Sequence, residues 1–327
     1  MNILFIIGNG FDINLGLKTR YQDFYDFYIS KPSKSSTIYE LKNNISKDLK
    51  NWANLELELG KYTKNISSID EFDEIYDDLI QHLGDYLEEQ ENSFLFKPEK
   101  LENFLSDLFK LDSFLSPAEK VDYETFTNIW KERTWKVNLM TFNYTKIIEK
   151  ILGEAIEQNM SIGKHHETFD VVFQGLVHIH GYHDERMILG VNDVSQIQNI
   201  KLHMVEDICG TFIKSEYNKG VGELIHERCE HLVNNANLIC IFGSSIGDTD
   251  KIWWELIGKR LRENSRLIIF KREGSELNLR FSSKTVRLKN KTKEDFLIKT
   301  NFNEKEKEEI KKKMYVAINS TIFSNLK

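Results

Sequence analysis

The sequence has few cysteines and no long apolar run, and each shortage argues against a class of protein. Its three cysteines are widely spaced and form no CxxC pair, which disfavours a disulfide framework and a cysteine zinc module. No apolar run approaches about 18 residues, so we expect no membrane span. The short first run lacks a basic flank, so we expect it to be a strand and not a signal peptide. We expect a cytoplasmic protein with buried free thiols.

Positive charge is also in short supply. Lysine and arginine total 44 against 51 aspartates and glutamates, a formal net charge of −7. A nucleic-acid-binding surface usually needs a basic face, so we expect no nucleic-acid partner. An anionic small molecule stays open as a ligand, because backbone amides bind phosphate without side-chain charge.

The apolar residues that are present gather in short runs bounded by glycine, asparagine or charge. These runs predict strands near residues 2–7, 136–142, 171–180, 238–243, 266–270 and 284–288. Helical patterns lie between the runs. Strands that alternate with helices predict an α/β fold with a Rossmann-like, doubly wound parallel sheet.

One long stretch departs from this alternation. Residues 31–135 carry helical patterns without a convincing strand, which predicts a helical insertion subdomain after the first strand. The candidate helices are 37–60, 69–91, 98–111 and 123–132. We expect chain breaks at residues 30–36 and 114–117, and prolines 98 and 117 in first helical turns.

The rest of the chain completes the predicted organisation. Residues 1–30 and 136–290 form the nucleotide-binding α/β domain, and 291–327 a C-terminal helical segment. Within that segment, a lysine- and glutamate-rich run from Asn303 predicts a helix that continues to Ile318.

The end of the first predicted strand carries the strongest signal. There the apolar run stops at a glycine turn, and a helical pattern follows from about Leu15; the turn is Gly8-Asn9-Gly10-Phe11-Asp12. Glycine lets the backbone approach a phosphate closely, and a helix N-terminus offers free N–H groups. The turn is not the full GxGxxG spacing. Two plainer interpretations stay open: the glycines only form a tight turn, and Asp12 only caps a helix.

Three later strands end in similar polar motifs. The second predicted strand ends at Asn143 and the third at His178-Ile179-His180-Gly181. The fourth ends at a turn that includes Ser244, Ser245 and Asp248, before a helix with Asp250 as N-cap. Because the carboxyl ends of parallel strands share one edge of a sheet, we expect these side chains to line one crevice. The three turn residues also fit ordinary turn and capping roles.

The histidines allow a second interpretation. His178 and His180 have the same parity along a strand and are expected to face the same way. With His183 and Asp184 they form a set that metal ions accept, although no HExxH or paired acidic motif accompanies it. We favour His180 as a functional residue without a metal, because Gly181 follows it at the crevice.

A helical motif lies in the predicted insertion. Trp52 and Glu56 are one helical turn apart. We expect Trp52 in the core and Glu56 in solvent, although Glu56 is close enough along the helix to reach the crevice.

These motifs, in this order, resemble the AbiH family of bacterial abortive-infection proteins. The resemblance covers most of the chain: the first glycine turn, Trp52 to Glu56, Thr141-Phe142-Asn143-Tyr144, His178 to Gly181, and Gly243 through Asp250. More distantly, the chain resembles the sirtuin-like group of NAD-consuming enzymes, which share a glycine-rich first turn, a Thr-x-Asn strand end and a His-Gly strand end.

The resemblance implies that NAD is a substrate and that the chain is an NAD hydrolase. Asn143 and His180 correspond to the residues that act on the nicotinamide–ribose bond, and no metal is expected. The glycine turn Gly8–Gly10 is then near the pyrophosphate, with Ser244 and Ser245 near a phosphate or the adenosine end. The cysteine zinc module of sirtuins is absent, which disfavours protein deacetylation.

Two rival functions remain at this point. One is a metal-dependent nuclease that uses the histidine set. The other is a non-catalytic nucleotide-binding sensor or adaptor that recruits a toxin through residues 31–135. A phage-derived trigger, a partner protein and a homo-oligomer also stay open as partners.

Overall fold

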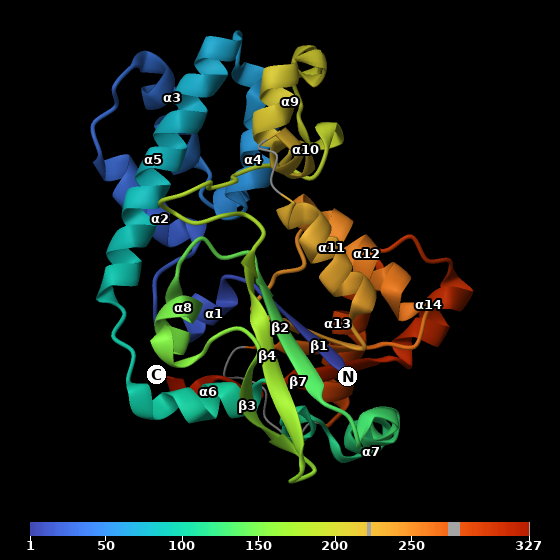
Figure 1. Cartoon of the computed structure of the whole chain (residues 1–327). Helices are drawn as coiled ribbons and strands as arrows, with labels where there is room; N and C mark the ends of the chain where they lie inside the picture. The colour runs from blue at the N-terminus through green and yellow to red at the C-terminus, as the bar shows by residue number, and fades with distance from the viewer. Residues whose placement is uncertain (221–223, 274–281, 327) are drawn as a thin grey trace.

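The computed structural model describes residues 1–220, 224–273 and 282–326, and a seven-stranded sheet lies at its centre (Figure 1). The strand order is β3-β4-β2-β1-β5-β6-β7. All neighbours pair in parallel except β3, which is antiparallel to β4. The strands are β1 Asn2–Ile7, β2 Trp135–Thr141, β3 Met160–His165, β4 Phe169–His178, β5 Leu238–Phe242, β6 Arg266–Lys271 and β7 Met314–Ile318.

The central strand explains why the sheet is buried on both sides. Along β1, Phe5 and Ile7 pack into one apolar cluster, whereas Leu4 and Ile6 pack into another. A parallel strand covered on both faces needs apolar residues at successive positions, which is the pattern that the first seven residues carry.

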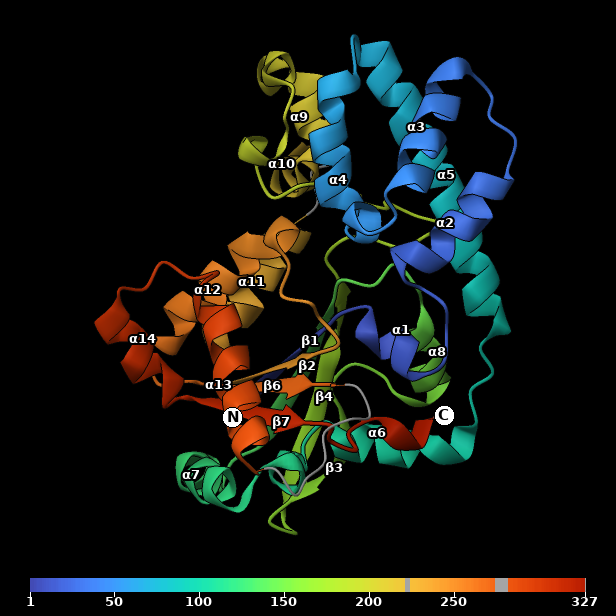
Figure 2. The same cartoon turned by 180° about the vertical axis from the view of Figure 1, so that it is seen from behind.

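Helices cover the two faces and also form a separate body (Figures 1 and 2). They are α1 Gly10–Asn14, α2 Tyr21–Ser30, α3 Ser36–Lys47, α4 Leu55–Tyr62, α5 Ile69–Ser93, α6 Leu101–Asp107, α7 Pro117–Thr127, α8 Ile147–Leu152, α9 Glu206–Phe212, α10 Lys214–Gly220, α11 Ile225–Asn235, α12 Lys251–Leu261, α13 Ser282–Leu297 and α14 Glu304–Lys311. Side chains of α6, α7 and α8 pack on one face of the sheet, and those of α11, α12 and α13 pack on the other. Among the described residues, no helix is long and apolar enough to cross a membrane.

The separate body, which we call the helical body, contains α2–α5, α9 and the chain at residues 187–202, held by one apolar cluster. It does not coincide with residues 31–135, because α6 and α7 from that range pack on the sheet instead. The division into an insertion subdomain therefore stays a prediction. The prolines at 98 and 117 do lie in first helical turns, as expected.

Several expected elements near the N-terminus were wrong. The helix after the first strand begins at Gly10 and not near Leu15, and it ends because Gly16 adopts a φ of +96° that a right-handed helix cannot continue. Residues 37–60 form two helices, since Asn54 starts α4 anew by accepting a hydrogen bond from the N–H of Leu57.

The C-terminal expectations also need correction. Residues 284–288 lie inside α13, anchored by the buried Phe296 and Leu297, and form no strand. The terminal helix stops at Lys311, and Met314–Ile318 forms β7 because this apolar run pairs with β6 and is buried. The edge strand β3, with the half-polar sequence MSIGKH, was not predicted because its local signal is weak.

Candidate functional site

A cavity of about 1080 Å³ lies between the sheet and the helical body. The ends of β1, β2 and β5 line it from the sheet, and residues of α4 and α5 line it from the helical body. The predicted residues that line it are Gly8, Asn9, Gly10, Asp12, Asn143, His180, Ser244 and Ser245. Most of the predicted site residues therefore lie at one cavity, because the carboxyl ends of the parallel strands share one edge of the sheet.

The two glycine turns at its floor pack directly on each other. The N–H of Gly8 donates to the carbonyl of Phe242 at 2.9 Å, and the N–H of Gly10 donates to that of Gly243 at 2.7 Å. A Cβ on Gly10 would lie 2.5 Å from the Cα of Gly243, closer than real Cβ contacts. The glycines are therefore required for contact between the turns, whatever the cavity binds.

Asp12 is buried beside Asn143 in the wall next to these turns. Nδ2 of Asn143 donates to Oδ1 of Asp12 at 3.0 Å, and the hydroxyl of Thr145 donates to Oδ2 at 2.6 Å. Burial raises the pKa of Asp12 to about 7, although both hydrogen bonds favour its charged form and lower that pKa. Asp12 is therefore a contact of Asn143, and its carboxyl is not the cap of a long helix.

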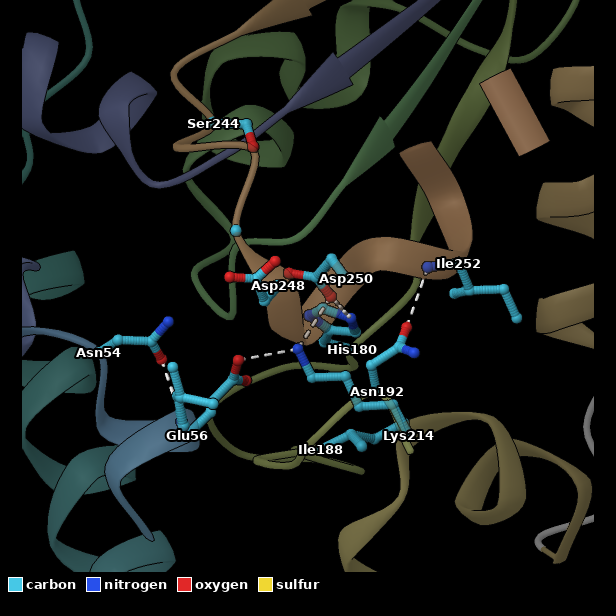
Figure 3. A network of polar contacts seen from close by, with 12 residues as sticks. Asn54, Glu56, His180, Ile188, Asn192, Lys214, Ser244, Asp248, Asp250 and Ile252 are labelled. Atoms are coloured by element: carbon cyan, nitrogen blue, oxygen red, sulfur yellow. Dashed lines mark hydrogen bonds and ion pairs between the residues drawn. The ribbon is translucent and has the colours of Figure 1, made fainter. Parts of the chain in front are cut away.

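A chain of buried polar groups forms another wall of the cavity (Figure 3). Nζ of Lys214 lies 2.9 Å from Oε2 of Glu56 and 2.8 Å from Oδ1 of Asp250. Nε2 of His180 lies 3.1 Å from the same Asp250 oxygen. Lys214 comes from α10 and Glu56 from α4, while Asp250 precedes α12. The contacts thereby join the helical body to the end of β4 and the start of α12.

The charges in this wall follow from the contacts. Burial disfavours ionised Asp250, but Lys214 and His180 outweigh it and hold the pKa of Asp250 well below its usual range. Burial also opposes the charge of Lys214, yet Asp250 and Glu56 raise its pKa. Burial and then Lys214 lower the pKa of His180, which favours the neutral form of its ring.

His178 and His180 do not face the same way, because β4 ends at His178 and the chain turns beyond it. Nδ1 of His178 contacts the carbonyl of Asn143 at 2.9 Å, and its Nε2 lies 2.8 Å from Glu149. His180 instead stacks on Phe142 with ring centroids 5.1 Å apart.

The alternative metal set is not brought together. His183 contacts Glu91 at 3.1 Å and Asp184 contacts Lys146 at 2.5 Å, so each member of the set has a different partner. Within the described ranges, no group of three or more His, Cys, Asp or Glu side chains is arranged to hold a metal ion.

Two predicted binding residues lie away from the cavity lining. The side chain of Phe11 is fully buried among aromatic rings, 5.4 Å from that of Phe323 between centroids. Asp248 pairs with Lys299 at 2.5 Å on the surface side of its turn. Asn9 lines the cavity, but its Nδ2 donates to the carbonyl of Thr19 at 2.6 Å and closes the loop before α2.

Sequence reasoning missed three residues of the charged wall. Glu56 was expected in solvent but is 5% exposed, and Asp250 stands at the N-cap position without a side-chain capping bond. Lys214 was not singled out at all. No local signal marks it, because its partners are 158 and 36 residues away along the chain. Trp52, by contrast, is buried in the core as expected.

Comparison with known families gives one assignment. The family model described as "Bacteriophage abortive infection AbiH" matches residues 4–271, which span the sheet from β1 to β6, the helical body and both walls of the cavity. No curated protein matches the chain. The match covers far more than half of the 327 residues. The chain therefore belongs to the AbiH family of bacteriophage abortive-infection proteins.

Proposed function

We propose that this protein acts in abortive infection by hydrolysing the bond between nicotinamide and ribose in NAD. The observation that carries the proposal is that Asn143 and His180 line one cavity together with both glycine turns. At about 1080 Å³, the cavity is at the upper end of ordinary ligand sites, which run to about 1,000 Å³.

The sheet topology also supports a dinucleotide ligand. The six parallel strands run β4-β2-β1-β5-β6-β7, an order that matches the 3-2-1-4-5-6 arrangement of Rossmann-type sheets. The direction of strand addition reverses between β1 and β5, and the cavity lies at the carboxyl ends of these two strands. Ligands of open α/β sheets bind at that reversal.

The reaction needs a water molecule, a base and a positioned ribose. Water bonds to C1′ as the C1′–N bond breaks; its electron pair moves into the cationic ring, nicotinamide leaves neutral, and the water's proton passes to a base. Nε2 of His180 lies 3.1 Å from ionised Asp250, which favours the tautomer with its proton on Nε2, so we assign Nδ1 as the nitrogen that takes the proton from water. Asn143 holds the ribose or the water, so that orientation supplies part of the rate.

The experiment follows NAD in two settings. In cells expressing the chain, NAD is measured during phage infection, and the purified protein is assayed for nicotinamide release. We expect His180→Ala to lower turnover by at least about 100-fold, the range of general-base contributions, and to abolish protection. The matched control is His231→Ala, an exposed histidine on α11, which should behave as the unaltered chain.

Two results decide against the proposal. If His180→Ala still consumes NAD, the assignment of the base is wrong. If NAD stays constant while protection remains intact, hydrolysis is not the activity, and the cavity serves a nucleotide-binding sensor or adaptor.

A further inference from the structure

Among the described residues, one polar atom of Asn143 has no hydrogen-bond partner. Its N–H donates to the hydroxyl of Thr141 at 3.1 Å, its carbonyl contacts His178, and its Nδ2 donates to Asp12. Only Oδ1 is buried with no hydrogen-bond partner among the described residues. Asn143 is 5% exposed and lines the cavity, and a buried acceptor left unpaired is costly.

Asp12 determines which end of the Asn143 amide faces the ligand. An ionised carboxylate can only accept hydrogen bonds, so the NH₂ group of Asn143 must face it and Oδ1 must face away. The hydroxyl of Thr145 donates to the second carboxylate oxygen, and the packing of Gly10 against Gly243 supports the short helix that carries Asp12. Asp12 therefore orients the amide of Asn143, and the contact between the two glycine turns helps to hold Asp12 in place.

We propose that Asp12 is a positioning residue that presents Oδ1 of Asn143 as a hydrogen-bond acceptor for an O–H group of the ligand. That O–H group belongs either to the nicotinamide ribose or to the attacking water. The inference rests on the proposed function for the identity of the ligand, but the Asp12–Asn143 contact itself does not depend on it.

The first test measures binding. In the His180→Ala background, which keeps the ligand intact, calorimetry compares NAD with analogues that lack the 2′- or the 3′-hydroxyl of the nicotinamide ribose. If the ribose is the donor, one deletion weakens binding about 10-fold, as expected for a lost hydrogen bond of about 1.4 kcal/mol. The amide in Asp12→Asn also permits the reversed orientation of Asn143. In that variant, the ratio of the Kd of the deletion analogue to the Kd of NAD should fall close to one.

The second test measures turnover with His180 present. If the attacking water is the donor, both deletions leave binding unchanged, and Asp12→Asn lowers kcat with little change in KM. The proposal is overturned if Asp12→Asn alters neither the hydroxyl-deletion ratio nor kcat.

A third test needs no ligand. In the full chain labelled with ¹⁵N-asparagine, the side-chain NH₂ signal of Asn143, identified by its loss in Asn143→Ser, should titrate with a midpoint near the Asp12 pKa of about 7. The other titratable groups that act on Asp12 are Glu91 from α5 and His178 at the end of β4, which shift the midpoint in opposite directions. The titration should vanish in Asp12→Asn.

The control for the NMR experiment is Asp107→Asn, the same change at another carboxyl with a pKa raised by burial, to about 6. It should leave the Asn143 titration in place. If NAD does not bind, the proposed function fails, and the NMR titration alone decides the inference. In that case, an Asn143 side-chain signal whose titration is the same in Asp12→Asn as in the unaltered chain overturns the inference.

Discussion

Asp12 and Asp250 both lie buried in the lining of one cavity, and their pKa values shift in opposite directions. Asp12 has hydroxyl and amide donors but, among the described residues, no cation in contact, and its pKa rises to about 7. Asp250 contacts Lys214 and His180, and its pKa falls well below the usual range. Burial penalises both carboxylates, so the difference comes from the buried cation.

This comparison divides the site into two kinds of wall. Separated carboxyl pKa values within one cavity are a common feature of sites that move protons. The Asp250 wall keeps fixed charges at neutral pH, whereas Asp12 changes charge near pH 7. Removing the cation from one wall and the carboxylate from the other tests the comparison directly.

The largest effect is expected from Lys214→Met. This change leaves Glu56 and Asp250 buried without their cation and should lower the free energy of unfolding by about 3–5 kcal/mol. Denaturant unfolding at pH 7 measures it. Combining it with Glu56→Gln and Asp250→Asn should recover most of the loss; if the triple variant is no more stable, the charge explanation is wrong.

The next effect is a pH-dependent stabilisation by Asp12→Asn. Since burial raises the pKa of Asp12 from 3.8 to about 7, its contribution to stability is complete below pH 3.8 and is lost as the pH rises through 7. The variant should therefore match the unaltered chain near pH 4 and exceed it at pH 8 by up to about 4 kcal/mol.

Unfolding of both proteins at several pH values between 4 and 8 checks this expectation. A stability difference that does not grow with pH would mean that Asp12 is not the group whose charge is penalised. A gain in stability with a loss of turnover would fit a site in which the carboxylate is kept for function.

A smaller effect is expected from Gly10→Ala, which disturbs the Asp12 wall alone. Its Cβ would meet the backbone of Gly243 at 2.5 Å, so the two turns must separate, at a cost of about 1–3 kcal/mol. The control is Gly210→Ala in α9, where a Cβ has no neighbour within 4 Å. Thermal unfolding should show a lower melting temperature only for the change at Gly10.

The smallest effect is expected from Asp248→Asn. This aspartate pairs with Lys299, but 51% of its side chain is exposed, so water screens the pair. The free energy of unfolding should change by less than about 1 kcal/mol. Denaturant unfolding at pH 7 measures the change. A larger loss would show that burial does not explain why the ion pairs of Lys214 stabilise the fold more than the Asp248–Lys299 pair.

The elements of the fold differed in how far sequence predicted them. β1 and β5 were predicted closely because continuous apolar runs ending at glycine carry their own signal. β7 was missed because the charged run before it suggested one long helix, and only pairing with β6 makes a strand of Met314–Ile318. Residues 284–288 show the opposite error: they were predicted as a strand but form part of α13, because the packing of this helix outweighs the local apolar pattern.

The sequence by itself determined which residues stand at the strand ends that line the site. Gly8, Gly10, Asn143 and His180 follow strand-like runs, and parallel strands must bring their carboxyl ends to one edge. Only the tertiary structure decided the walls. Lys214 meets Glu56 across 158 residues of chain, and Asp12 meets Asn143 across 131. Burial and distant partners set those charges, and neither is encoded in the residues adjacent along the chain.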